Sequence, residues 1–214
     1  MSLKVIAFDA DDTLFVNEPY FQETEEKFCA LMSDYLSHQG LSQELFKTEI
    51  ANLELYGYGI KGYILSMIEA AMKISNNTIS IETIEKITEY GKELLQKPIE
   101  LLDGVEETLA ALKGKYKLIV ATKGDLKDQH RKLHDSGLGH YFHHIEVMSD
   151  KTNLDYEKML TYFERYDVLD LDDDELNFIE VEQQVIPESP VSPINFYKFK
   201  PKSPSNTEIV IENN

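Results

Sequence analysis

Acidic side chains gather just after a short apolar stretch near the start of the sequence. Residues 5–8 read Val-Ile-Ala-Phe, and Asp9, Asp11, Asp12 and Thr13 come directly after them. Acids this close together repel one another unless a cation or backbone N–H groups compensate their charge. Carboxylates can attack an electrophile, transfer a proton or bind a cation. The same pattern is also found in a polar turn that caps a buried strand, with Asp12 or Thr13 as the N-cap.

The apolar residues before this cluster predict how it is positioned. Residues 5–8 form a short run that includes two β-branched side chains, which indicates a buried strand. In open α/β sheets, ligands bind just outside the carboxyl ends of the strands. The predicted strand therefore brings its carboxylates to the part of the sheet where chemistry is expected.

Two further apolar segments are also followed by polar residues. Residues 116–121 predict a second strand followed by Thr122, and residues 142–148 predict a third strand before Lys151. In a parallel sheet these strand ends lie at one edge, together with the acids after the first strand. Thr122 is also a common type of N-cap. Lys123 and Lys158 are alternative cations, and both are expected to be exposed.

A long helical region separates the first strand from the second. Residues 18–95 show apolar side chains at steps of three and four, with Gly40 and Ser42 marking the first break. A segment with three glycines, residues 56–62, marks the next break. Four helices joined by short loops predict a small bundle inserted between the first strand and the following βα elements.

Composition excludes several classes of protein. The chain has 214 residues, a net charge of −18 and one cysteine, Cys29. The negative charge argues against nucleic acid and anionic membranes as partners, and one cysteine excludes an internal disulfide framework. The sequence shows no signal-peptide pattern and no apolar run long enough for a membrane span. We therefore expect a cytoplasmic protein, monomeric or homodimeric.

The last part of the chain differs in character. Residues 176–181 predict a fourth strand, and five of the seven prolines lie between residues 187 and 204. We expect residues 184–214 to be a loosely ordered, proline-rich extension with a short edge strand near residues 208–211.

In order along the chain, these motifs resemble those of the haloacid dehalogenase-like (HAD) hydrolase superfamily. The resemblance rests on Asp9-x-Asp11-x-Thr13, on the turn at residues 121–124 and on Lys151, and it covers residues 1–165. It implies an α/β fold with a three-layer, Rossmann-like parallel sheet and an inserted four-helix cap. The implied core consists of residues 1–16 and 99–183, with the cap at residues 17–98.

The resemblance implies a Mg²⁺-dependent phosphatase that acts on a small phosphorylated metabolite. Asp9 corresponds to the nucleophile that forms an aspartyl-phosphate, and Asp11 to the group that protonates the leaving alkoxide and later activates water. Thr122 and Lys123 correspond to phosphate-binding positions, and Lys151 to the lysine that pairs with Asp9 and the phosphate. Phosphoryl transfer requires such an in-line nucleophile and compensation of charge on the phosphoryl oxygens.

The chain departs from the family in its fourth motif. Members carry a strand that commonly ends in Gly-Asp or a similar pair, with another acid a few residues later. These acids complete a Mg²⁺ site with the groups that correspond to the Asp9 carboxylate and the Asp11 backbone carbonyl. Here the corresponding strand ends at Glu180 and Glu182, and either is a candidate for the metal. The acidic run at residues 170–174 precedes that strand and is interpreted as a solvated loop. The departure supports an alternative, a HAD-like binding or regulatory protein that has lost catalysis.

Other readings remain within the family. A phosphomutase would differ only in its phosphate acceptor, and Asp11 counts against a haloacid dehalogenase, whose chemistry needs no acid two residues after the nucleophile.

Tyr56, Tyr58 and Lys61 lie in the glycine-rich break and are the candidate substrate-selecting residues of the cap. The same residues could form a plain connection between helices.

Overall fold

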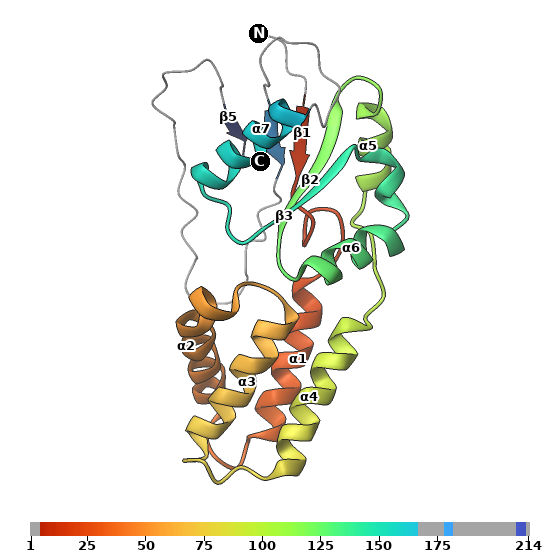
Figure 1. Ribbon diagram of the computed structural model, residues 1–214. Helices are drawn as coiled ribbons and strands as arrows, with labels where there is room; N and C mark the ends of the chain where they lie inside the picture. Colours follow the sequence, from red (N-terminus) through yellow and green to blue (C-terminus); the bar gives the residue numbers. More distant parts are fainter. Residues whose placement is uncertain (1–4, 167–177, 182–208, 213–214) are drawn as a thin grey trace. The chain divides into compact units, whose positions relative to one another are not determined.

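The structure is a computed structural model that describes residues 5–166, 178–181 and 209–212 (Figure 1). The chain divides into two compact units. The first comprises residues 1–16, 100–122 and 130–214, and the second comprises residues 17–99 and 123–129. Apart from residues 209–212, the predicted extension at residues 184–214 lies outside the described residues.

The first unit is built on a five-stranded sheet with the order β3-β2-β1-β4-β5. Its strands are β1 (Val5–Phe8), β2 (Lys117–Lys123), β3 (His144–Met148), β4 (Phe178–Val181) and β5 (Ile209–Glu212). The pairs β1–β2, β1–β4 and β4–β5 are parallel. The predicted α/β class, parallel sheet and helical insertion after β1 are therefore confirmed, and strands form at both predicted C-terminal positions.

Apolar residues bury β1 and β2 beneath helix α7 (Asn153–Tyr166). Val5 and Ala7 share one face because side chains alternate along a strand. That face belongs to a core cluster of Val5, Ala7, Ile119, Ala121, Met148, Tyr156, Met159, Leu160 and Phe163. Fully burying one large apolar side chain is worth roughly 1.5–3 kcal/mol, so this cluster fixes α7 on the sheet. Helices α5 (Val105–Leu112) and α6 (Leu126–Asp135) and the short helix η1 (Leu138–Tyr141) occupy the connections around β2.

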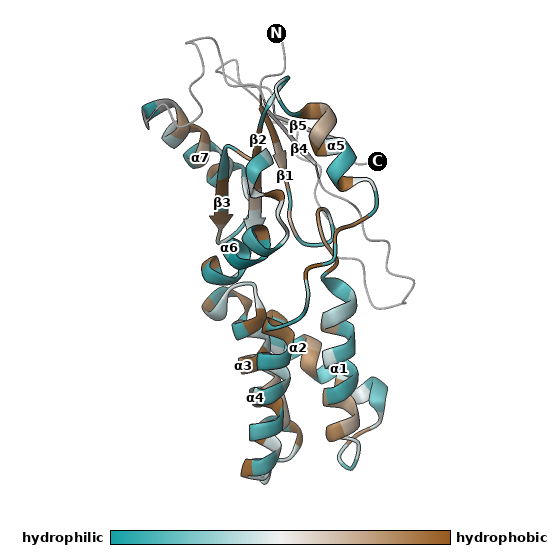
Figure 2. Cartoon of the chain, turned by 90° about the vertical axis from the view of Figure 1, so that its right-hand side faces the viewer, coloured by the Kyte–Doolittle hydropathy of each residue, from teal (hydrophilic) through white to brown (hydrophobic). Residues whose placement is uncertain are grey.

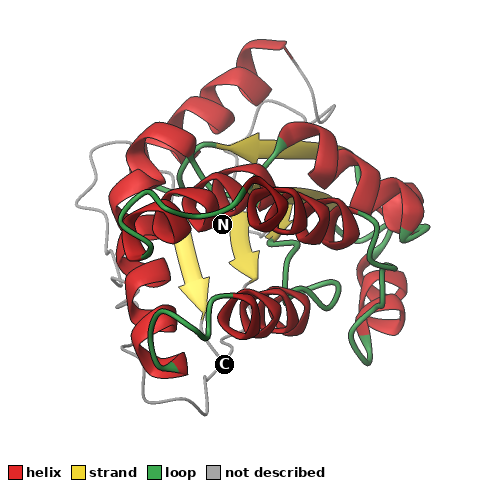
Figure 3. Ribbon diagram, turned by 90° about the horizontal axis from the view of Figure 1, so that it is seen from below, coloured by secondary structure: helices red, strands yellow, loops and turns green. Residues whose placement is uncertain are grey.

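The second unit contains the inserted helices. Residues 17–99 form only helices and turns (Figure 3), with α1 (Glu18–Leu31), α2 (His38–Tyr56), α3 (Ile60–Ile74) and α4 (Ile81–Leu95). Teal and brown bands alternate along α3 and α4 (Figure 2), as expected for helices with one apolar face. Their apolar side chains form a second core: Phe28, Cys29, Met32, Leu41, Leu45, Ile60, Tyr63, Met67, Ala70, Ala71, Ile87 and Leu94.

The start of α2 differs from the prediction. Gly40 and Ser42 were expected to interrupt the helical pattern, but both lie inside α2, so this expectation is wrong. The Ser37 side chain accepts a hydrogen bond from the Gly40 amide at 3.3 Å and caps the helix, which begins at His38. An N-cap serine satisfies an amide that the first turn leaves without a helical partner, and this allows the helix to begin before the glycine.

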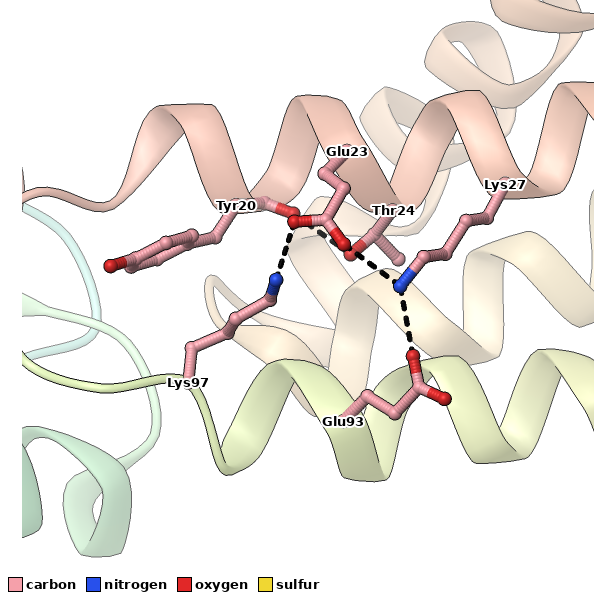
Figure 4. A network of polar contacts seen from close by, with 6 residues as sticks. All are labelled: Tyr20, Glu23, Thr24, Lys27, Glu93 and Lys97. Carbon is pink, nitrogen blue, oxygen red and sulfur yellow. Dashed lines mark hydrogen bonds and ion pairs between the residues drawn. The ribbon is translucent and has the colours of Figure 1, made fainter.

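Ion pairs connect α1 with α4 and the residues that follow it (Figure 4). Lys27 Nζ lies 2.9 Å from carboxylate oxygens of both Glu23 and Glu93, and Lys97 also pairs with Glu23. Hydrogen bonds from Lys97 and then Lys27 lower the pKa of the Glu23 carboxyl to about 2. The two glutamates are exposed and the two lysines partly exposed, so the pairs add little stability and mainly connect the beginning of the insert with its end.

Close packing between α3 and α4 depends on Gly91. A Cβ atom at this position would lie 2.5 Å from Ile64 Cγ1. Gly91→Ala should destabilise the protein by about 1–2 kcal/mol, because overpacking of about 1–3 kcal/mol outweighs the helix propensity gained over glycine. Urea unfolding measures this change. Gly40→Ala is the matched control, since its Cβ would make ordinary contacts of 3.4 Å or more and should be neutral or stabilising. Equal stability of the two variants would contradict the packing argument.

Glu49 of α2 carries a carboxyl that the fold prefers to keep protonated. Burial, followed by the nearby charges of Glu25 and Glu18, raises its pKa to about 7. The unfolded chain ionises this group at lower pH, so native stability falls as the pH rises from about 4.5 to 7 and then stays constant.

Glu49→Gln should remove this penalty. We expect the variant to gain about 1–3 kcal/mol over the wild type at pH 8 and to show little gain at pH 4.5. Denaturant unfolding at both pH values measures the difference. Glu54→Gln, at an exposed position of the same helix, is the control. A gain of Glu49→Gln that does not change with pH would show that the carboxyl is not destabilised by burial.

Candidate active site

The turn after β1 is closed by its own backbone. The carbonyl oxygen of Ala10 accepts hydrogen bonds from the amides of residues 13–15 at 2.8–3.4 Å. Asp12 has a φ of 57°, in the left-handed region that aspartate tolerates better than most residues. The turn therefore holds Asp9 and Asp11 directly at the carboxyl end of a buried strand.

Lys151 reaches the first of these acids. Its Nζ lies 2.9 Å from Asp9 Oδ1, and the lysine side chain is only 9% exposed. Lys151 follows β3 and precedes α7, whose start is fixed by reciprocal hydrogen bonds between Thr152 and Asp155. The Thr152 hydroxyl is also the main cause of a lowered pKa of the Asp155 carboxyl. The sheet and the capped helix thus place the ammonium beside Asp9.

The two alternative lysines have other partners. Lys158 Nζ lies 3.6 Å from Asp155 on an exposed part of α7. Lys123 ends β2, and its Nζ lies 4.0 Å from the centroid of the Tyr58 ring within the second unit. Of the three lysines considered from sequence, Lys151 is bonded to Asp9.

Thr122 lies level with the acidic turn. Phe8 of β1 pairs with Val120 of β2, so the register places Thr122 beside the residues that follow β1. The threonine is buried, with 1% of its surface exposed. Its position at the strand end agrees with the predicted arrangement, and its role toward phosphate remains a prediction.

A second buried lysine was not anticipated from sequence. Lys132 of α6 has a side chain only 8% exposed, and its Nζ lies 2.7 Å from Asp11 Oδ1. Its sequence context suggests instead an ordinary helical i,i+4 pair with Asp128. Three polar residues of α6 are buried together: Asp128, Gln129 and Lys132. Their burial would have pointed to Lys132, but the sequence alone does not show which side of α6 is buried.

The predicted substrate-selecting residues of the insert already have partners within the second unit. The Tyr56 hydroxyl donates to Glu69, and Lys61 Nζ lies 3.0 Å from Asp125 Oδ1. Gly59 has a φ of 117°, and a Cβ there would lie 2.9 Å from the Asp125 backbone nitrogen. Glycine at this position allows the two segments to approach each other. Substrate selection by these residues remains a prediction.

The Asp9 carboxylate and the Asp11 backbone carbonyl are the groups that the family resemblance assigns to a metal ion. The two side chains are partly exposed, at 20% and 25%. Magnesium commonly uses one or two protein carboxylates, with waters and substrate phosphate completing its octahedral shell, so this donor set fits Mg²⁺. Glu180 pairs through its backbone with Ala7, and its side chain lies outside what the structure describes, as do Glu182 and residues 170–174. Within the described ranges, no group of three His, Cys, Asp or Glu residues is arranged for a metal.

Solved structures with the same architecture come from several bacteria. A haloacid dehalogenase-like family hydrolase from Xanthomonas campestris is 37% identical, with 85% of this chain and 73% of that chain covered and a TM-score of 0.74. YfnB from Bacillus subtilis, solved with magnesium, is 20% identical, with coverage of 84% and 78% and a TM-score of 0.52. A 2-haloacid dehalogenase from Pseudomonas syringae pv. tomato is also 20% identical, with coverage of 86% and 79% and a TM-score of 0.52.

Two comparisons concern the sequence more directly. No curated protein matches the chain, whereas residues 3–162 match the family described as haloacid dehalogenase-like hydrolase. Among the described residues, no helix is both long enough and apolar enough to cross a membrane. The matched region contains Asp9, Asp11, Thr122 and Lys151. The chain therefore belongs to the haloacid dehalogenase-like hydrolase family.

Proposed function

We propose that this hydrolase is a Mg²⁺-dependent phosphatase that acts on a small phosphorylated metabolite through an aspartyl-phosphate. The observation that carries the proposal is the hydrogen-bonded pair of Lys151 and Asp9, 2.9 Å apart, with Asp11 two residues away. A buried ammonium keeps a neighbouring carboxylate ionised and therefore nucleophilic.

The first half of the proposed reaction transfers the phosphoryl group to the protein. A carboxylate oxygen of Asp9 attacks phosphorus, and the bond from phosphorus to the ester oxygen breaks. The leaving oxygen takes a proton from the carboxylic acid of Asp11, and the alcohol departs. Lys151 balances negative charge on Asp9 and on the phosphoryl oxygens, with Thr122 at the neighbouring strand end as a hydrogen-bond donor.

The second half releases inorganic phosphate. Asp11, now a carboxylate, accepts a proton from a water molecule as that water attacks phosphorus, and the bond to Asp9 breaks. The Asp9 carboxylate and the Asp11 backbone carbonyl would hold Mg²⁺, which supplies charge neutralisation to the phosphoryl oxygens when bound. The magnesium bound in the YfnB structure supports the choice of metal. Asp11 supports a phosphatase over a dehalogenase, because an alkoxide needs a proton and a halide does not.

Asp9→Asn tests the nucleophile. Release of phosphate from p-nitrophenyl phosphate with Mg²⁺ should fall by at least about 10³-fold, because the amide cannot form the acyl phosphate. Removal of Mg²⁺ with EDTA should also abolish the wild-type activity, and added Mg²⁺ should restore it. A wild type no more active than Asp9→Asn with any of several divalent metals would support the alternative, a HAD-like binding or regulatory protein.

Asp11→Asn tests the proton-transfer group. The turnover of p-nitrophenyl phosphate should fall by about 10²–10⁴-fold, since the second half of the reaction needs a base even when the leaving group does not need an acid. Steady-state kinetics at saturating substrate measure the loss. An unchanged turnover number would remove the assigned role of Asp11.

A further inference from the structure

Asp125, in the segment that follows β2, is bonded twice to one residue of the insert. One of its carboxylate oxygens accepts a hydrogen bond from the Lys61 amide at 3.2 Å, and the other lies 3.0 Å from the Lys61 ammonium. The Asp125 side chain is 18% exposed, and that of Lys61 is 60% exposed. Both residues belong to the second unit. Lys61 therefore engages both oxygens of the carboxylate, while its ammonium stays in contact with water.

The start of α3 explains why a carboxylate is held here. Lys61 is the second residue of this helix, and Gly59 before the helix has no side chain that could cap its amides. Amides in the first turn of a helix have no helical partner, and the positive end of the helix favours a negative charge. Asp125 supplies both the acceptor and the charge from a distant segment. The cap therefore fixes Asp125 even when the exposed Lys61 side chain moves.

The pair is close along the chain to the predicted phosphate-binding residue. Asp125 is the third residue after Thr122, so their Cα atoms are at most about 11 Å apart. Between them, Lys123 places its ammonium 4.0 Å from the centroid of the Tyr58 ring. Charges interact over roughly 8–10 Å at moderate ionic strength. A charged leaving group on a phosphate bound at Thr122 would therefore interact with the groups around Asp125.

We propose that Asp125 is a specificity-determining residue that neutralises Lys61, so that the protein prefers phosphate monoesters with an uncharged alcohol part over those with a second anionic group. The inference rests on the proposed phosphatase function and names its substrate class. The chain carries a net charge of −18, so a second anionic group binds only where local cations offset that charge. Asp125 removes one such cation, and the exposed ring of Tyr58 offers an apolar surface to an uncharged group.

Two aryl phosphates separate the effect of charge from that of shape. Phenyl phosphate has an uncharged ring, and 4-carboxyphenyl phosphate carries a carboxylate on a ring of similar size. Their leaving phenolates have similar basicity, so the ratio of kcat/KM, carboxylated over uncharged, reports how the site treats the added charge. The ratio does not depend on how much of a variant is folded, because both substrates are measured on one sample. In the wild type with Mg²⁺ we expect a ratio below one, and a preference for the carboxylated substrate would overturn the proposal.

Asp125→Asn leaves the Lys61 ammonium uncompensated and keeps a side-chain oxygen that can cap α3. We expect the ratio to rise by about 3–10-fold at low ionic strength, as for one unit charge added several ångströms away in a largely aqueous setting. The rise should shrink in about 1 M NaCl, where charges are screened over roughly 3 Å. Asp135→Asn is the matched control and should leave the ratio unchanged. It removes the acid of an ion pair with Arg131 at the far end of α6, about 15 Å along the helix.

The double variant Asp125→Asn with Lys61→Met identifies the source of the effect. It removes both charges, so the ratio should return to the wild-type value. If Lys61 instead attracts anionic groups in the wild type, the ratio of the double variant would fall below the wild-type value, and the proposal would be wrong. An unchanged ratio in Asp125→Asn would refute it as well.

The activity of the wild type distinguishes the two ways in which the inference can fail. If the wild type and Asp9→Asn are equally inactive on both aryl phosphates, the proposed phosphatase function fails, and the substrate class fails with it. If the wild type is active and Asp125→Asn leaves its ratio unchanged, the phosphatase function stands and the role of Asp125 alone is overturned.

Discussion

The negative charges of two neighbouring carboxylates, Asp9 and Asp11, must be compensated, and the first unit is arranged around this constraint. Asp9 and Asp11 are fixed close together by a turn of the backbone, and each has a nearly buried lysine within 3 Å. Breaking a buried ion pair by removing one partner costs about 3–5 kcal/mol, because the remaining charge stays out of water. The fold therefore has to deliver two ammonium groups to this turn from elsewhere in the chain.

Two different helices meet this requirement. Lys151 precedes α7, which is anchored on β1 and β2 by its apolar face, whereas Lys132 lies within α6 after β2. The parallel register between β1 and β2 adds Thr122 at the same level. The site is consequently distributed over three consecutive strand ends and one helix, and the packing of the sheet determines its geometry.

The sequence was sufficient to place the polar residues that directly follow a strand. Asp9, Thr122 and Lys151 each come after an apolar run, and the parallel sheet that these runs predict brings their strand ends to one edge. Lys132 could not be found in this way, because a lysine at helical spacing from an acid has the same pattern on an exposed face as on a buried one. Gly40 was misinterpreted because the start of α2 is determined by a single capping contact. The Gly40 amide donates a hydrogen bond to the Ser37 side chain, and the sequence alone does not show that contact.

The insert leaves and rejoins the first unit at one hydrogen-bonded point. The Val16 amide donates to the Glu100 carbonyl at 2.8 Å, and Phe15 and Leu101 form an antiparallel bridge beside it. The entropic cost of closing a chain excursion grows only slowly with its length. Residues 17–99 can therefore change in length and sequence over evolutionary time while the hydrogen bonds between residues 15–16 and 100–101 stay the same. A lineage with this architecture can therefore exchange the whole insert while the turn after β1 and the neighbouring strand ends keep their structure.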